Sequence, residues 1–464
     1  MTALTERAPA AARMTGRQRL ILLLLLGSQF MLAVDFSILN VALPVIGAGL
    51  GFALADLQWV ATAFALTAAG FTLLAGRVAD LFGRRRLFLA GMALLGLSSL
   101  AGGLASSPGM LLAARVAQGL ATAVVTPAGL SLLTTSFPEG PLRSRALGLN
   151  GALMSAGFTS GAVLGGLLTD LLSWRWAFLV NVPVALAVLV AAPALLAESR
   201  PERRPAMDVP GAVTVTTGLL ALVFGLTRAG EHGFADPLAL GSLAAAAALL
   251  VAFWFAERRA ASPLVPPAVL ARPSVRWGNL AGLVAFATET SLVFLLTLYL
   301  QKVLGYSALA TGLAFGVLGL GTVAGGLAAP RVLARTGTRR ALALGFGAQA
   351  VATASLALLG TGPGWIWLLL AATFAGGVGN MLAIVAFMVT ATSGLPDAEQ
   401  GLATGIATMT QQVGITMGIP VMSAITTAAM GAGSGAAAVL HGLVAAILVN
   451  AALALAAVAI RPNR

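Results

Sequence analysis

A cluster of charge between two long apolar runs constrains this chain more than any other feature. The stretch from Gly76 to Arg86 (GRVADLFGRRR) holds four arginines and one aspartate, and mostly apolar sequence flanks it on both sides. A charged side chain in the bilayer interior costs at least about 2.5 kcal/mol, so this cluster cannot lie in hydrocarbon. The stretch therefore predicts a short turn between two membrane helices, on the cytoplasmic side by the positive-inside rule.

The composition points to a membrane protein throughout. Apolar residues make up 59% of the chain and charged residues 9%, with a mean hydropathy of +0.96, whereas about a quarter of residues are charged in soluble domains. The apolar runs do not alternate with polar residues, which excludes a β-barrel. The formal charge of +12 is spread over predicted loops without interleaved aromatic residues, so we expect no nucleic-acid partner. The chain has no cysteine, which excludes disulfides and thiolate metal sites.

Apolar segments of the length of a membrane helix, about 20 residues, recur along the whole chain. We expect fourteen: Leu20 to Gly47, Asp56 to Arg77, Leu87 to Ser106, Gly109 to Leu132, Ala146 to Leu171, Trp174 to Leu196, Val209 to Thr227, Pro237 to Ala256, Trp277 to Leu300, Ala308 to Pro330, Ala341 to Leu359, Gly364 to Thr390, Gly401 to Ala429 and Ala436 to Ile460.

Loop charges set the expected orientation. With both termini in the cytoplasm, nearly all arginines fall in cytoplasmic loops or tails, and one miscounted helix would invert every later loop. The arginine-rich turn also recurs: Arg77-Val78, Gly83 and Arg85-Arg86 align with Arg331-Val332, Gly337 and Arg339-Arg340. This match favours an internal repeat, although an Arg- and Gly-rich chain can produce parts of it by chance.

The expected fold is an all-α membrane protein with two six-helix bundles and two extra transmembrane helices between them. Its parts are a cytoplasmic tail (1–19), an N-terminal bundle (20–197), a linker with the two inserted helices (198–273), a C-terminal bundle (274–460) and a short tail (461–464). The basic N-terminal segment precedes an apolar run without a small-residue cleavage site, so we expect a retained first helix. We expect a multi-pass protein of the inner (cytoplasmic) membrane.

Three ionisable residues remain deep inside the predicted helices: Asp35, Arg115 and Glu289. Such groups face the protein interior and usually have a partner or a function. The alternative is a buried ion pair that only orders helices. Asp35 lies in a segment with Asn40 and Pro44, and it can exchange a proton if its distance from an arginine changes. We expect Arg115 to be that partner.

Polar and small residues suggest further roles for three helices. Arg115, Gln118 and Gly119 share one helix face, and Gly157, Gly161, Gly165 and Gly166 form a stripe on which another helix can pack closely. Gln411 and Gln412 either line a cavity or bond across helices. The sequence shows no hydrolase triad, metal-ligand cluster or phosphate-binding loop, so we expect neither an enzyme nor an ATP-driven pump, and no cofactor.

These motifs resemble those of the major facilitator superfamily, in particular its fourteen-helix drug:proton antiporters, from Leu20 to Ile460. The turn from Gly76 to Arg86 is similar to the superfamily's loop motif, with Leu81 where a basic residue is usual. The helix with Arg115, Gln118 and Gly119 resembles the motif assigned to proton coupling. The glycine stripe resembles the antiporter motif, although Ala162 replaces its proline, and Gln411 stands where the subgroup often has arginine.

The resemblance implies a central cavity open alternately to either side of the membrane. Asp35, Arg115 and Glu289 would couple protons, while Gly76, Asp80, Gly83, Arg84 and Arg85 would form a conformational latch. The substrate cavity would include Asn40, Gln118, Phe286, Glu289, Phe294, Tyr299, Gln411 and Gln412, with the aromatic rings available to a cation. The partners would be a small molecule, protons and the lipid bilayer, and we expect a functional monomer.

Two functions remain open at this point. The first is export of lipophilic, cationic drugs or antibiotics in exchange for protons. The alternative is dedicated export of an endogenous metabolite such as a siderophore, peptide or natural product. A scaffold or receptor that does not transport is disfavoured by the acids at mid-membrane and by the lack of a sizeable predicted domain outside the membrane.

Overall fold

The computed structural model describes residues 14–52, 56–137, 141–198, 208–233, 235–260, 263–265, 267–393, 397–431, 433 and 435–460. Some side chains within these ranges lie outside the description, among them those of Asn40, Arg77 and Asp80. These ranges are helical and contain no strand, as the sequence predicts. The α-helices of the N-terminal part are α1 (Gly16–Leu50), α2 (Gln58–Phe82), α3 (Arg84–Gly103), α4 (Pro108–Ser136), α5 (Pro141–Leu171), α6 (Trp176–Leu179) and α7 (Asn181–Leu195). They are followed by α8 (Val209–His232), α9 (Pro237–Arg259), α10 (Pro267–Leu270), α11 (Pro273–Leu298), α12 (Ala308–Ser355), α13 (Ile366–Thr392), α14 (Asp397–Met430) and α15 (Ala436–Ala457).

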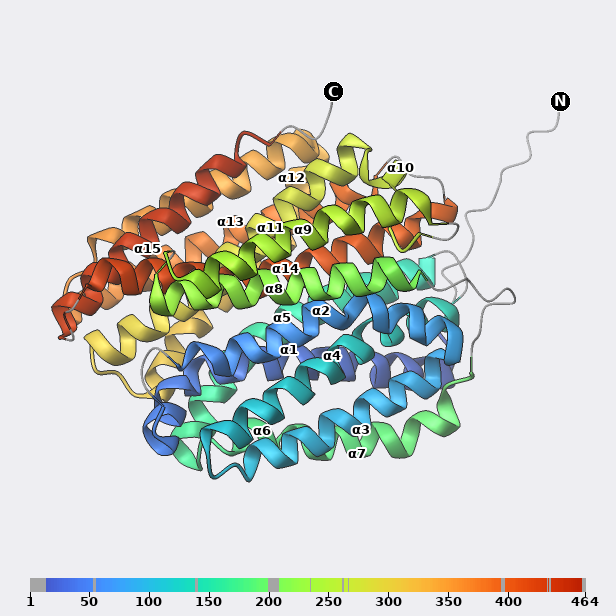
Figure 1. The fold of residues 1–464 in the computed structure, drawn as a ribbon, viewed down its shortest axis with the longest axis horizontal. Helices are drawn as coiled ribbons and strands as arrows, with labels where there is room; N and C mark the ends of the chain where they lie inside the picture. Colours follow the sequence, from blue (N-terminus) through green and yellow to red (C-terminus); the bar gives the residue numbers. More distant parts are fainter. Residues whose placement is uncertain are drawn as a thin grey trace, which may run out of the picture.

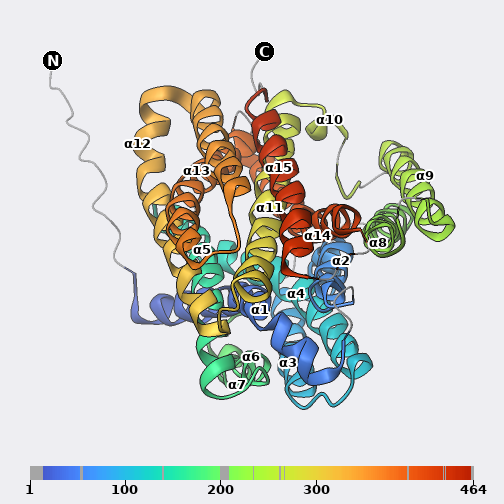
Figure 2. The same cartoon turned by 90° about the vertical axis from the view of Figure 1, so that its left-hand side faces the viewer.

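Short irregular turns continue two of these helices and begin a third. A π-helical turn, Tyr299–Val303, follows α11, and 3-10 turns at Leu356–Leu358 and Pro363–Trp365 follow α12 and precede α13. The helix α12 is in fact two helices, because Gly337 has φ 75° and ψ 166° and interrupts the helical path. A positive φ is readily adopted only by glycine. The bend separates the two segments that the sequence predicted on either side of this loop (Figure 2).

Eleven helices of the described residues are long and apolar enough to cross a membrane. Many of their large apolar side chains lie on the outer surface, for example Leu97 and Val190, where lipid would cover them. The chain is therefore a multi-pass membrane protein.

The helices form two groups that lie one above the other in Figure 1, α1 to α7 below and α11 to α15 above. The groups meet where α5 packs on α12 and where α2 packs on α14. The helix α8 packs on both α2 and α14, and α9 packs on α8 at the outside of the molecule (Figure 2). Because α8 meets both groups, it lies beside their junction, with α9 on its outer side.

One end of the junction is closed by direct contacts. The side-chain amide of Gln301 donates to the carbonyl of Val41 at 2.9 Å, and the backbone N–H of Leu309 donates to the carboxylate of Asp170 at 2.9 Å. This is the end opposite to Arg84–Arg86, and we call it the Gln301 end. The two groups are tied together there.

Candidate functional site

Asp35 lies at the centre of a buried network and accepts hydrogen bonds from two other helices. Its carboxylate accepts hydrogen bonds from Arg115 (3.3 Å) and Gln118 (3.1 Å) of α4 and a short one from Asn181 of α7. The side chains of Asp35 and Arg115 are exposed by 0% and 1%, respectively. Burial of an ion pair is tolerated where hydrogen bonds satisfy both partners, and these donors meet that condition for the carboxylate.

The guanidinium of Arg115 is held on its other sides as well. Its Nε donates to the carbonyl of Val60 at 2.9 Å, and its Nη1 donates to the amide oxygen of Gln118 at 2.9 Å. Its central carbon lies 4.2 Å from the centroid of the Phe64 ring. A ring face attracts a guanidinium. Since Val60 and Phe64 belong to α2, a movement of α2 relative to α4 would change the position of Arg115 against Asp35.

Two members of this network were not singled out from the sequence. Asn181 begins α7 in an apolar run, and Ser99 of α3 accepts a hydrogen bond from Gln118 at 2.8 Å. The only signal was an isolated polar residue inside each predicted membrane helix. The sequence did predict that Arg115 would partner Asp35, and the structure brings these two side chains together.

The glycine stripe of α5 holds α1 beside the network. A Cβ at Gly157 would lie 2.7 Å from the carbonyl oxygen of Phe30, and one at Gly161 would lie 2.7 Å from that of Val34. Gly165 faces Ile38 in the same way, while Gly166 faces α12 instead. The first three glycines therefore permit close packing of α5 on the part of α1 that carries Asp35.

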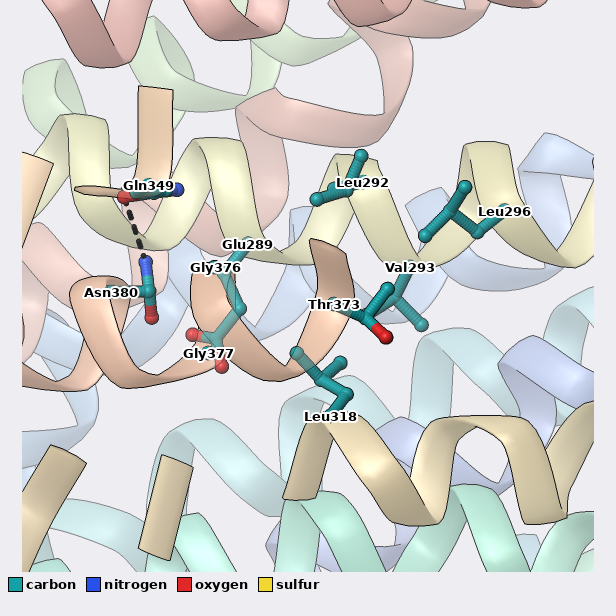
Figure 3. A pocket seen from close by; sticks show the side chains of 10 residues that line it. All are labelled: Glu289, Leu292, Val293, Leu296, Leu318, Gln349, Thr373, Gly376, Gly377 and Asn380. Atoms are coloured by element: carbon teal, nitrogen blue, oxygen red, sulfur yellow. Dashed lines mark hydrogen bonds between the residues drawn. The ribbon is translucent and has the colours of Figure 1, made fainter. Parts of the chain in front are cut away.

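Glu289 lies apart from this network, on α11, where two cavities meet. The first is a small cavity of about 20 Å³ and lies among α11, α12 and α13 (Figure 3). The second, of about 10 Å³, lies between the two helix groups, with Phe158 and Ala162 of α5 in its wall. Glu289, Val293 and Leu318 line both cavities. Among the described residues, no side chain or backbone N–H donates a hydrogen bond to Glu289.

A second polar network lies next to the first cavity. The amide nitrogen of Asn380 donates to the carbonyl of Ala285 (3.1 Å) and to Gln349 (3.4 Å), and Gln349 donates to Thr288 at 2.8 Å. Asn450 donates to the carbonyl of Thr288 at 3.0 Å. The amide oxygens of Asn380 and Asn450 are both buried and accept no hydrogen bond.

The other residues expected in a substrate cavity do not line these two. Phe286 packs edge-on against Phe387 with ring centroids 6.2 Å apart, Phe294 is buried in the core, and the hydroxyl of Tyr299 donates to the carbonyl of Gly360 at 2.7 Å. Gln411 and Gln412 are half-buried on α14. The side chain of Asn40 lies outside the described residues. Of the residues expected there, Glu289 borders both cavities and Gln118 joins the Asp35 network.

The turn expected to act as a latch contacts the end of α7. The backbone N–H of Arg85 donates to Glu198 at 3.1 Å and its guanidinium donates to the carbonyl of Leu196 at 3.0 Å. Gly83, with φ 109°, leaves room for the Glu198 carboxylate. Gly76 lies close to Pro127 of α4. The side chain of Asp80 lies outside the described residues, so its expected role in the latch stays a prediction.

The profile that describes the Major Facilitator Superfamily matches residues 25–419, which is most of the chain. The chain belongs to the Major Facilitator Superfamily. This confirms the family resemblance inferred from the sequence motifs.

Curated relatives within the Major Facilitator Superfamily carry the names of antibiotic exporters and resistance proteins. The chain is 41% identical to the cephamycin export protein CmcT of Amycolatopsis lactamdurans, over 86% of this chain and 83% of that protein. It is 38% identical to the puromycin resistance protein pur8 of Streptomyces alboniger, over 91% of this chain and 86% of that protein. Such relatives indicate a transporter of small molecules rather than an enzyme.

A solved transporter has the same fold. A bacterial homolog of the human lysosomal transporter Spinster, described as inward-facing and unoccupied, aligns with a TM-score of 0.64 at 17% identity, over 97% of each chain. At this identity the likeness concerns the fold alone. The Asp35 network and the Glu289 cavities are thus two separate acidic sites within a superfamily transporter.

Proposed function

We propose that this chain exports lipophilic, cationic drugs or antibiotics across the cytoplasmic membrane in exchange for protons, by alternating access. The observation that carries the proposal is the difference in surroundings between two acids inside the helix groups. Asp35 is buried and enclosed by donors from its own helix group. Glu289 borders one cavity within the α11 to α15 group and one at the junction of both groups, and it receives no hydrogen bond from the described residues. Asp35 suits proton coupling, and Glu289 suits a cationic substrate.

The coupling would depend on the surroundings of Asp35. With Arg115 at 3.3 Å the deprotonated carboxylate is stabilised, and separation of the two would leave a desolvated carboxylate that favours the proton. Arg115 also donates a hydrogen bond to the carbonyl of Val60 on α2, and α2 packs on α14 of the other helix group. A movement of the two helix groups relative to each other can therefore change the distance between Arg115 and Asp35. Contacts at the Gln301 end would break when the transporter opens to the outside.

The membrane topology is part of the proposal. Eleven spans are evident in the described residues, the bend at Gly337 divides one of them, and α2 and α5 have the length of spans. This is consistent with fourteen transmembrane helices, two six-helix bundles with α8 and α9 inserted between them, both termini in the cytoplasm, and a functional monomer. Reporter fusions after α8 and α9 should report opposite sides of the membrane, and the same side would contradict this topology.

A second candidate is dedicated export of one natural product. The observation that favours it is the 41% identity to a protein named for cephamycin export. A susceptibility panel separates the two functions: cells with and without the protein are exposed to dyes, biocides and antibiotics including cephamycin and puromycin. Protection against several unrelated lipophilic cations supports the drug exporter, and protection confined to one chemical class supports the dedicated exporter. No change for any compound would contradict both.

A further inference from the structure

The cavity among α11, α12 and α13 combines a charged acceptor with an orphaned neutral acceptor. Glu289 contributes a carboxylate, and Asn380, itself 4% exposed, contributes an amide oxygen that accepts no hydrogen bond. The orientation of this amide is fixed, because its nitrogen already donates to Ala285 and Gln349. In Figure 3 the oxygen of Asn380 points away from Gln349, on the side where the Glu289 carboxylate lies.

The other described residues that line this cavity do not donate hydrogen bonds to these two acceptors. Thr373 donates its hydroxyl to the carbonyl of Leu369 at 2.8 Å, and no lining residue carries a positive charge. A Cβ at Gly376 would meet only Ala352, at 3.6 Å, so the α13 wall is open there. The other walls are apolar, with Leu292, Val293, Leu296 and Leu318.

We propose that this cavity is the subsite for a primary or secondary ammonium group of the exported molecule, with Glu289 as counter-charge and Asn380 as the acceptor that selects N–H donors. The proposal rests on the proposed function and adds the class of cation. A quaternary ammonium has charge but no N–H, so it can pair with Glu289 and leaves the amide oxygen unsatisfied. A buried polar group without a partner is costly. At about 20 Å³ this cavity has room for the ammonium head alone. The apolar body of the molecule would extend past Glu289 toward the junction of the two helix groups, where the second cavity lies.

The test compares one amine with its quaternary analogue on purified full-length protein in detergent. The probes are 4-phenylbutylamine and its N,N,N-trimethyl derivative, with affinities from isothermal titration calorimetry. A hydrogen bond to a charged group predicts that the wild type binds the amine roughly tenfold more tightly than the analogue. Asn380→Ala should remove most of this ratio by weakening the amine alone, and Glu289→Gln should weaken both probes.

Asn450→Ala is the matched control. Asn450 is also a buried asparagine of this helix group with an unsatisfied amide oxygen, but it does not line the cavity. Its replacement should leave the ratio unchanged. Should Asn380→Ala fail to fold, Gly376→Leu, which fills the open wall without removing a hydrogen bond, must abolish binding of both probes.

Three results would overturn the proposal: equal affinities in the wild type, no binding of either probe, or an unchanged ratio in Asn380→Ala, as expected if a water satisfies the amide oxygen. The proposed function is tested separately by pH-driven uptake into proteoliposomes of a permanently charged panel compound, which cannot cross lipid as a neutral base. Selective binding without uptake supports the subsite and contradicts the exporter. Export of other compounds together with equal binding of both probes supports the exporter and contradicts the subsite.

Discussion

Replacement of Gly161 by alanine tests whether close packing of α5 on α1 positions Asp35. A Cβ at this position would lie 2.7 Å from the carbonyl oxygen of Val34 and 2.9 Å from the Cβ of Ser37. Ordinary contacts between such atoms are about 3.5–4.0 Å, so the two helices must separate by roughly 1 Å. The nearest obstacle is backbone and cannot rotate away. The displaced segment of α1 includes Asp35.

Two opposing effects set the expected magnitude. Overpacking of a tight interface costs typically about 1–3 kcal/mol, while alanine in place of glycine within a helix contributes about 0.5–1 kcal/mol. Gly161→Ala should therefore lower the free energy of unfolding by on the order of 1–2 kcal/mol. Gly27→Ala is the control on α1, because no atom lies within 4 Å of a Cβ there. That variant should be as stable as the wild type or slightly more stable.

Thermal unfolding in detergent measures the stability, and export by cells with matched protein levels measures the function. Gly161→Ala should unfold at a lower temperature and export less, because Asp35 moves relative to Arg115 and Asn181. Gly27→Ala should export normally. If Gly161→Ala matches Gly27→Ala in both measurements, the tight contact does not position Asp35.

Three other substitutions have definite expected outcomes. Tyr299→Phe removes the hydrogen bond from the side-chain hydroxyl to the carbonyl of Gly360. Thermal unfolding should show a loss of stability of about 0.5–1.5 kcal/mol, and the substrate profile should stay unchanged. An altered profile would place the ring in the cavity after all. Glu198→Gln weakens the ion pair with Arg86 (3.8 Å) and the hydrogen bond from the backbone N–H of Arg85. It should slow export with little effect on unfolding, since partly exposed pairs contribute about 0–1 kcal/mol; an unchanged export rate would contradict a role in the latch. Asn181→Ala removes one donor to Asp35 and should shift the pH dependence of export at normal expression, and an unshifted profile would leave Asn181 a packing residue.

Much of the fold could be predicted from the sequence, because apolar length and loop charge are local properties of a membrane helix. The separate helices on either side of Gly337 are an example. Pairing of Asp35 with Arg115 was also predictable, since a charge at mid-membrane needs an opposite charge and few candidates exist. The hydrogen bond from Asn181 to Asp35 could not be predicted, because a single amide in an apolar run does not reveal which helix face it occupies or which helix it meets.

The expectation for the aromatic residues shows a second limit. Glu289, Val293 and Leu296 recur with helical spacing and face the same cavity. Phe294 is five residues from Glu289, about 140° around the helix, and so it packs in the core instead. Helical periodicity could have excluded Phe294 from a site with Glu289. The orphaned oxygen of Asn380 could not be foreseen, because it depends on contacts between three helices.

Uptake into proteoliposomes driven by a pH gradient alone tests the central claim most directly. The substrate is the panel compound with the largest rise in inhibitory concentration, and wild type is compared with Asp35→Asn, which keeps the shape of the side chain. Wild type should concentrate the compound against its gradient, and Asp35→Asn should bind the compound without concentrating it. If Asp35→Asn accumulates the compound as the wild type does, Asp35 does not carry the coupled proton and Glu289 becomes the leading candidate. If the wild type does not accumulate the compound, the chain is not a proton-driven exporter.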